Sequence, residues 1–304
     1  MKLSVSAMLS FLFVLTLFSC GGNKPDFDGD SAFGYLVKQC DFGPRNPGSR
    51  GHNNTLNYLL TEMRTFADSV KVQKFSHFDK RTGISLDLTN IIASFKVSDA
   101  NRVLLAAHWD TRPRSDQDQI PSKRNQPLLG ANDGASGVAV LLELAKVFSE
   151  NPPPVGVDLI LFDGEDFGEE GDLDRYFLGS RHFAKNFTGK TPKWAIIRDM
   201  VGDAELELPI ERYSFERNKK LVEKVWDAAE RAGASQFKRR LGSYVQDDHL
   251  MLYEYAGIEA IDIIDFDYTR GGINLWHTSL DTPEMCSPAS LAAVGRTLIE
   301  LIYE

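Results

Sequence analysis

The stretch VDLILFDGEDFGEE, residues 157–170, joins an apolar run to a burst of carboxylates. Its residues 159–162 are continuously apolar, which is typical of a strand buried on both faces of a parallel sheet. In open α/β sheets ligands sit at the carboxyl ends of central strands, and acids buried there need a positive partner. The stretch therefore predicts a divalent metal beside Glu165 and Asp166. A solvated loop would explain Glu169 and Glu170, but not the two acids that directly follow the apolar run.

Two other apolar runs end in the same way, VLLAAHWD at residues 103–110 and AIIRDM at residues 195–200. Parallel strands joined by helices bring their carboxyl ends to one edge of the sheet. Two loops are expected to reach that edge, GANDGASG at residues 130–137 and LWHT at residues 275–278. The side chains that would meet there are His108, Asp110, Asp133, Glu165, Asp166, Asp199 and His277.

Imidazole and carboxylate groups form the usual ligand set of a catalytic zinc site. Each group also has an ordinary structural explanation. His108 alone would be read as a hydrogen-bond donor after a strand, and Asp133 as the N-cap of a helix that begins near Ala135. The agreement of five elements favours the metal site.

The 304 residues show no internal repeat, no low-complexity tract and no change in composition, so we expect one α/β domain. The net charge of −9, without a run of Lys or Arg, argues against nucleic acid as a partner. Expected strands are residues 70–75, 86–95, 103–107, 157–162, 194–197 and 258–264. Two helices are expected to begin near Ser31, which would be the N-cap, and near Asn53. Four others are expected to span residues 138–148, 176–186, 215–232 and 288–303.

The N-terminus is read as a targeting segment rather than part of the fold. Residues 8–18 are apolar but too short to cross a bilayer, and they lead into Ser19-Cys20-Gly21. This pattern resembles a bacterial lipoprotein signal, residues 1–19, with a lipid on Cys20; an ordinary secretory signal is the alternative. Residues 20–30 are then a flexible tether and residues 31–304 the catalytic domain. We expect attachment to a membrane of the bacterial cell envelope, facing the periplasm or the cell surface.

Two cysteines remain in the predicted domain, Cys40 and Cys286. Neither has the spacing of a metal site. They are interpreted as small buried apolar residues, with a single disulfide as the alternative.

Taken in order, HWD, GANDGASG, FDGED, RDMVG and LWHT resemble the zinc aminopeptidase superfamily. Within it, QDDH at residues 246–249, WHTSLDTPE at residues 276–284 and GSRHFAK at residues 179–185 resemble the glutaminyl cyclases of the animal and bacterial type. The resemblance extends from about residue 35 to the C-terminus. It implies a three-layer α/β/α sandwich with a central mixed, twisted sheet and a zinc site at the C-terminal ends of the parallel strands.

The resemblance also implies roles for individual residues. Asp133, Asp166 and His277 match the ligands of a single zinc. Glu165 matches the catalytic acid/base, and Asp199 and Asp247 match the acids around it. Trp276 and Gln246 match positions that bind the substrate. His108 and Asp110 match motif positions that aminopeptidases use for, or next to, a second zinc.

The implied reaction is cyclisation of the N-terminal glutamine of peptides or proteins to pyroglutamate, with release of ammonia, by a monomer that holds one zinc. The first alternative is a two-zinc aminopeptidase, in which His108 and Asp199 complete a second metal site and Asp247 is only a helix N-cap. The second is a non-catalytic envelope lipoprotein on the same fold.

The sequence departs from the cyclase pattern in its expected pocket. Many cyclases have two glutamates where this chain has Glu165 and Asp166. A pocket tryptophan is missing near Gly171, and Phe266 and Tyr268 stand at shifted positions in place of a second aromatic residue. Asp262 occupies a position where animal cyclases have histidine.

Overall fold

The computed structural model describes residues 24–169 and 171–304. The predicted signal segment, Cys20 and the first residues of the predicted tether lie outside the described residues. Six strands form the central sheet in the order β1-β2-β4-β3-β5-β8. Their bounds are Ser69–Asp79 for β1, Ile84–Phe95 for β2, Arg102–His108 for β3, Gly156–Phe162 for β4, Ala195–Asp199 for β5 and Ala260–Ile264 for β8.

The sheet is mixed. Strands β1 and β2 form a long antiparallel hairpin, and β2 also pairs antiparallel with β4. Strands β4, β3, β5 and β8 run parallel to one another. The parallel strands are almost wholly buried, as their uninterrupted apolar runs predict. Alternate residues serve opposite faces: Leu105 and Ala107 belong to one hydrophobic cluster, Leu104 and Ala106 to another.

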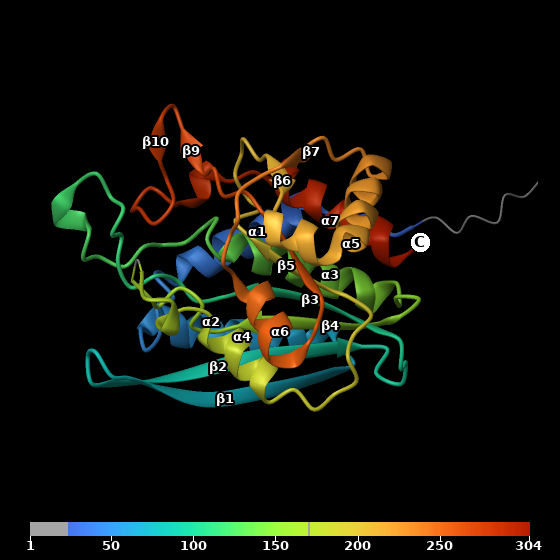
Figure 1. Cartoon of the computed structure of the whole chain (residues 1–304), viewed down its shortest axis with the longest axis horizontal. Helices are drawn as coiled ribbons and strands as arrows, with labels where there is room; N and C mark the ends of the chain where they lie inside the picture. Colours follow the sequence, from blue (N-terminus) through green and yellow to red (C-terminus); the bar gives the residue numbers. More distant parts are fainter. Residues whose placement is uncertain (1–23, 170) are drawn as a thin grey trace, which may run out of the picture.

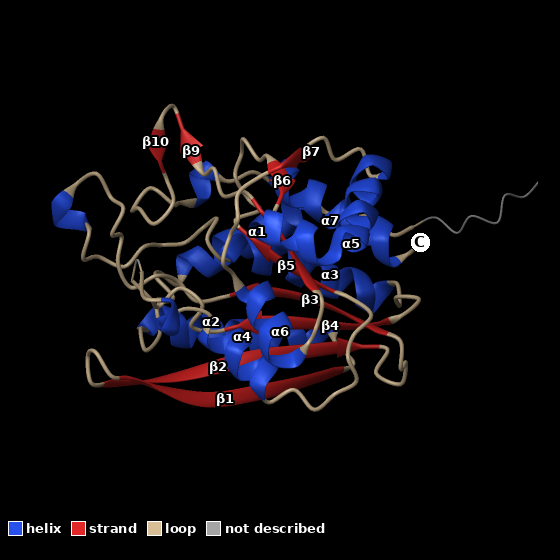
Figure 2. Ribbon diagram, in the orientation of Figure 1, coloured by secondary structure: helices blue, strands red, loops and turns tan. Residues whose placement is uncertain are grey.

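Helices cover both faces, so the predicted three-layer α/β/α architecture is confirmed (Figures 1 and 2). The larger cluster holds α1 (Gly29–Asp41), α2 (Arg50–Phe66), α3 (Ala135–Glu150), α5 (Arg212–Arg231) and α7 (Pro288–Ile302). The smaller cluster holds α4 (Leu178–Lys185) and α6 (Asp248–Ala256), which lie in front of the sheet in Figure 1. No helix among the described residues has the length and hydropathy of a membrane span.

The folded domain begins before residue 31, where the tether was expected to end. Phe27 is buried, and its ring packs so closely on Gly295 of α7 that a Cβ there would collide with it. The N-cap of α1 is Asp28, not Ser31, because the Asp28 carboxylate accepts the backbone N–H groups of Asp30 and Ser31. Ser31 instead donates its hydroxyl to a carboxylate of α3.

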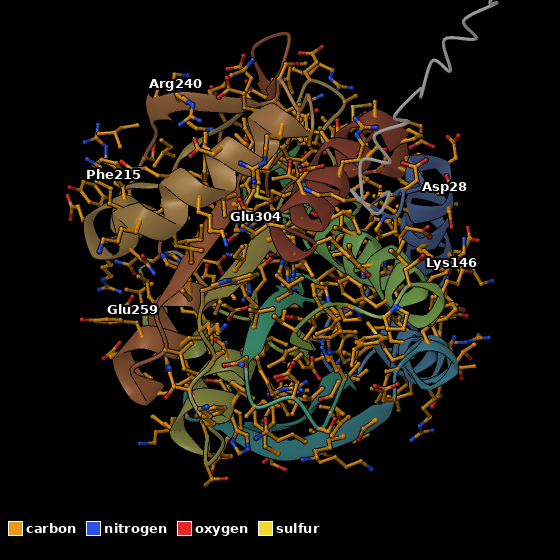
Figure 3. All side chains as sticks on the ribbon, turned by 90° about the vertical axis from the view of Figure 1, so that its right-hand side faces the viewer. Asp28, Lys146, Phe215, Arg240, Glu259 and Glu304 are labelled. Atoms are coloured by element: carbon orange, nitrogen blue, oxygen red, sulfur yellow. The ribbon has the colours of Figure 1, made fainter. Side chains whose placement is uncertain are left out.

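Several short elements were not predicted. β6 (Leu208–Ile210) pairs with β7 (Phe237–Leu241), and β9 (Thr269–Arg270) with β10 (Ile273–Asn274). Single 3₁₀ turns, η1, η2 and η3, occur at Pro121–Lys123, Leu173–Arg175 and Pro283–Met285. The loop after β3 and the β9–β10 hairpin protrude at the left of Figure 1. Figure 3 looks onto the opposite side, where Asp28 and Glu304 both lie.

The two cysteines of the domain are free thiols and buried, as the default interpretation of their spacing predicts. Cys40 lies in α1 and Cys286 directly after the η3 turn. Both belong to the larger hydrophobic cluster, where each serves as a small apolar side chain.

Candidate active site

A cavity of about 280 Å³ opens at the carboxyl ends of the parallel strands. Eight of the ten predicted site residues line it: Asp133, Glu165, Asp166, Asp199, Gln246, Asp247, Trp276 and His277. The other two, His108 and Asp110, are buried next to these residues without lining the cavity. We call this cavity the catalytic pocket.

Asp133, Asp166 and His277 form a candidate metal site. Each offers one ligand atom, and these atoms lie within 4.8 Å of one another. His277 Nε2 is 3.6 Å from Asp133 Oδ2 and 3.4 Å from Asp166 Oδ1. Asp166 Oδ2 is buried with no hydrogen-bond partner, which is costly unless a cation or water completes it. Burial, helped by repulsion from Arg112, lowers the pKa of His277 to about 3 and leaves the neutral imidazole that binds metals.

The donors fit a zinc ion bound by three protein groups with an open fourth position. Asp133 is free for this role because it does not cap α3. The N-cap is Gly134, with no side-chain hydrogen bond.

His108 makes a second set of close contacts on the other side of Asp133. Its Nε2 lies 3.1 Å from Asp199 Oδ1 and 3.2 Å from Asp133 Oδ1. Burial alone would lower the pKa of His108, but the attraction of Asp199 and the neighbouring carboxylates raises it well above its usual range. These three residues also lie close enough to one another to hold an ion.

Two buried aspartates fix the turns that carry the metal donors. Asp110 accepts the backbone N–H groups of Glu165 and Asp166 at 3.0 and 3.3 Å. Asp281 accepts those of Asn132 and Asp133 at 2.8 and 3.2 Å. Both oxygens of Asp110 are therefore occupied by the backbone, which gives it a positioning role. Asp281 was not singled out from the sequence, although it lies inside WHTSLDTPE.

Arg112 was also missed. Its buried guanidinium donates to Asp166 Oδ1 at 2.6 Å and holds both oxygens of Asp116 at 2.8 and 2.6 Å. The group lies 5.5 Å from the centre of the Tyr176 ring, in the pocket wall. Arg112 thus binds Oδ1 of Asp166 and leaves Oδ2 without a hydrogen-bond partner. In the sequence, only the length of the loop that begins at Arg112 indicated a functional role for this segment.

Three carboxylic acids form the remaining polar wall. Burial is the main cause that raises the pKa of Glu165 well above its usual range, with repulsion from Asp166 and Asp247 adding to it. Burial raises the pKa of Asp199 to about 7 against the attraction of His108. A carboxyl with a raised pKa can carry a proton near neutral pH, as a general acid must.

Asp247 has two roles, one for each oxygen. Oδ1 accepts the N–H of Asp248 at 2.5 Å, so Asp247 is the N-cap of α6, as the structural alternative predicted. Oδ2 is buried without a hydrogen-bond partner and remains available to the acid cluster. Capping therefore does not exclude a part in catalysis.

Of the two aromatic residues expected in the pocket wall, Phe266 and Tyr268, only Phe266 is there. Phe266 lines the catalytic pocket and meets the ring of Trp276 edge-on, with centroids 5.2 Å apart. Tyr268 does not line the pocket; it is buried and donates its hydroxyl to Asp281 at 3.0 Å. Tyr176 and Phe177 also line the pocket, as does Gly171, the position near which a tryptophan was missing.

Backbone strain also gathers at the site. Phe177, Met200 and His277 have positive φ values of 58°, 51° and 57°. Non-glycine residues in this region cost about 1–3 kcal/mol each, and such residues cluster where function requires them. Phe177 explains why α4 starts at Leu178 and not at Tyr176, since the left-handed residue interrupts the helix.

Asp262 lies beneath the site, beside Asp247 and His249. Both its oxygens are buried without hydrogen-bond partners. Burial and repulsion from Asp247 and Glu211 raise its pKa well above the usual range, which favours the neutral acid.

Comparison with known proteins places this geometry in a family. The model of Peptidase family M28 matches residues 90–302. The crystal structure of a Bacteroides thetaiotaomicron glutaminyl cyclase bound to N-acetylhistamine is 37% identical and aligns with a TM-score of 0.88 over 93% of this chain and 99% of that one. A Zn-dependent exopeptidase from Parabacteroides distasonis is equally similar, at 37% identity and a TM-score of 0.88 over 93% of this chain and 100% of the other.

Among curated sequences, a glutaminyl-peptide cyclotransferase-like protein of Bos taurus is 30% identical over 149 residues, 46% of this chain. The matched segment spans 37% of that relative, well under half its length. The chain therefore belongs to peptidase family M28, and within this zinc aminopeptidase superfamily it is a homologue of the bacterial glutaminyl cyclases.

Proposed function

We propose that the protein is a zinc-dependent glutaminyl-peptide cyclotransferase, which converts the N-terminal glutamine of peptides or proteins to pyroglutamate and releases ammonia. The observation that carries this proposal is the grouping of three acids, Glu165, Asp199 and Asp247, in the same pocket as the candidate metal donors. The similarity to bacterial glutaminyl cyclases over nearly the whole chain supports it.

Zinc bound by Asp133, Asp166 and His277 would polarise the side-chain amide of the substrate and stabilise negative charge on its oxygen. The neutral α-amine attacks the amide carbon, the new C–N bond closes the lactam, and the bond to the amide nitrogen breaks. Glu165 takes a proton from the attacking amine and delivers it to the departing ammonia.

The residues around Glu165 make this transfer feasible. Burial, with added repulsion from Asp166 and Asp247, raises the pKa of Glu165 against the attraction of His108. The backbone N–H of Glu165 donates to Asp110, and this hydrogen bond fixes the position of the Glu165 backbone at the end of β4. Trp276 stacks on His277, with centroids 3.7 Å apart, and supplies a flat wall for the glutamine side chain.

One zinc per chain is part of the proposal. His277 has a depressed pKa and a free lone pair, whereas His108 lies within hydrogen-bonding distance of Asp199 and has a raised pKa. The His108 ring itself lies between Asp133 and Asp199, with Nε2 at 3.2 and 3.1 Å from their carboxylates, where an aminopeptidase would hold its second metal. Asp110, the other motif residue on that side, already accepts two backbone N–H groups.

A two-zinc aminopeptidase is the second candidate. The observation in its favour is that His108, Asp133 and Asp199 also offer ligand atoms within 4.8 Å of one another. The Zn-dependent exopeptidase of Parabacteroides distasonis matches the chain as well as the cyclase structure does.

Replacement of His108 distinguishes the two candidates. In a one-zinc cyclase, His108→Ala keeps the zinc and lowers turnover by displacing Asp199, about 10- to 100-fold, the range for residues that orient a metal site. In a two-zinc peptidase the same change removes one metal and nearly all hydrolysis. Zinc content by mass spectrometry, together with turnover of Gln-initiated and Leu-initiated peptides, provides the measurement. Loss of one of two bound zincs would contradict the cyclase.

We also propose that the protein is a lipoprotein of the bacterial envelope, anchored through Cys20. The described chain starts on the side shown in Figure 3, whereas the loop after β3 and the β9–β10 hairpin protrude from the other side (Figures 1 and 3). An anchor attached at that start would leave the catalytic pocket open.

Cys20→Ser should release the protein from membranes without changing its specific activity, because every predicted site residue belongs to residues 108–277. Fractionation and metabolic fatty-acid labelling test this, with Cys40→Ser as the control that keeps the label. Equal labelling of wild type and Cys20→Ser would show that Cys20 carries no lipid.

A further inference from the structure

The catalytic pocket continues on one side into a larger cavity of about 840 Å³. Leu173, Phe177 and Gln246 line both, so the two spaces are continuous. We call the larger cavity the side groove. Its other walls are Asp174, Arg181, Arg217, Leu250, Met251, Tyr253, Glu254, Tyr255 and Gly257. A peptide whose first residue fills the catalytic pocket must leave it along such an opening.

The side groove offers exposed apolar side chains among two carboxylates and two arginines. Leu173 is 47% exposed and Tyr253 44% exposed, although both are large hydrophobic residues. The guanidinium of Arg217 lies over the rings of Tyr213 and Tyr253, at 5.6 and 4.5 Å from their centres. Stacking holds this group flat and leaves its N–H groups for acceptors such as peptide carbonyls.

Phe177 and Gln246 lie where the side groove meets the catalytic pocket. Phe177, with its left-handed backbone, donates its N–H to the carbonyl of Glu165 at 2.9 Å. Gln246 is exposed at the junction, and no hydrogen bond among the described residues uses its carboxamide. A free carboxamide at this point can pair with the backbone of a peptide that crosses from one space to the other.

The opening on the other side is far more acidic. A cavity of about 420 Å³ shares Val245, Ile264 and Phe266 with the catalytic pocket and carries six carboxylates and one arginine. Its deeper acids already have partners within the protein. Asp265 accepts the N–H groups of Glu207 and Asp267, and Asp203 pairs with Arg270. The two openings therefore predict different substrates.

We infer that the side groove binds the residues that follow the N-terminal glutamine and selects a large apolar or aromatic side chain at the second position. This inference rests on the proposed cyclase function. An aromatic side chain at that position packs against Leu173 and Tyr253, and the next carbonyls face Arg217.

The test compares cyclisation of Gln-Phe-Ala amide, Gln-Ala-Ala amide and Gln-Lys-Ala amide. For the wild-type protein we expect kcat/KM to be about tenfold higher with Phe than with Ala, mainly through KM, as for a well-packed aromatic contact. Tyr253→Ala should reduce this ratio to about two. Phe78→Ala, which removes an exposed aromatic residue from β1, is the matched control and should keep the ratio.

An unchanged Phe-to-Ala ratio in Tyr253→Ala would overturn the inference while leaving the cyclase function intact. A preference for Lys that disappears in Asp267→Asn would also overturn it, because the peptide would then lie over the acidic cavity. Absence of cyclisation with all three peptides would overturn the proposed function and this inference together.

Discussion

Glu165→Gln lowers kcat for cyclisation by roughly 10²–10⁴, the range for general acid–base catalysis, while the protein keeps its zinc. Glutamine preserves the shape of the side chain but cannot shuttle a proton between the α-amine and the leaving ammonia. The metal donors are not touched, because Asp166 keeps its own carboxylate and its contact with Arg112. Steady-state kinetics and zinc content, measured on the same preparation, test this result.

Glu169→Gln is the matched control, since it changes a partly exposed acid in the same turn, which pairs with Arg81 and lies near Arg114 and Arg175. It should have normal turnover. Near-normal cyclisation by Glu165→Gln would remove Glu165 from the mechanism. Loss of zinc from this variant would instead identify Glu165 as a ligand.

His277→Ala and Asp166→Asn each strip the zinc and reduce cyclisation by roughly 10³-fold or more, because Lewis-acid stabilisation is worth several kcal/mol. Two donors remain in each variant, fewer than the three that hold a catalytic zinc. Asparagine can still accept from Arg112, so Asp166→Asn separates loss of the ligand charge from loss of the Arg112 contact.

Zinc affinity, measured by competition with a chelator, gives a readout that does not depend on activity. Thermal unfolding of the metal-free proteins serves as the control for folding. Stoichiometric, tightly bound zinc in His277→Ala would show that the ligand set is wrong.

The sequence predicted the sheet well because the parallel strands are buried on both faces. Continuous apolar runs such as residues 159–162 have few other structural explanations. The acids and imidazoles that end these runs could be placed together from topology alone, and the structure brings His108, Asp133 and Asp199 within contact distance. The predicted start of the domain at residue 31 was too late. Phe27 already belongs to the fold, because it packs on α7 near the C-terminal end of the chain.

The supporting residues of the site could not be predicted in the same way. Arg112 and Asp281 act through contacts to residues 54 and about 150 positions away, and no local pattern encodes such pairings. Phe266 and Tyr268 lie two positions apart in an irregular loop, where no helical or strand period says which ring faces the pocket. The left-handed backbone of Phe177 is not signalled by its residue type, because phenylalanine rarely adopts it.

The product formed from a Gln-initiated peptide tests the central claim most directly. The zinc-loaded protein is incubated with Gln-Phe-Ala amide, and the products are analysed by mass spectrometry and an ammonia assay. We predict a single peptide product lighter by one ammonia, one ammonia released per turnover, and no cleavage of Leu-Phe-Ala amide. Free glutamine and Phe-Ala amide, without ammonia, would contradict the cyclase assignment and identify an aminopeptidase.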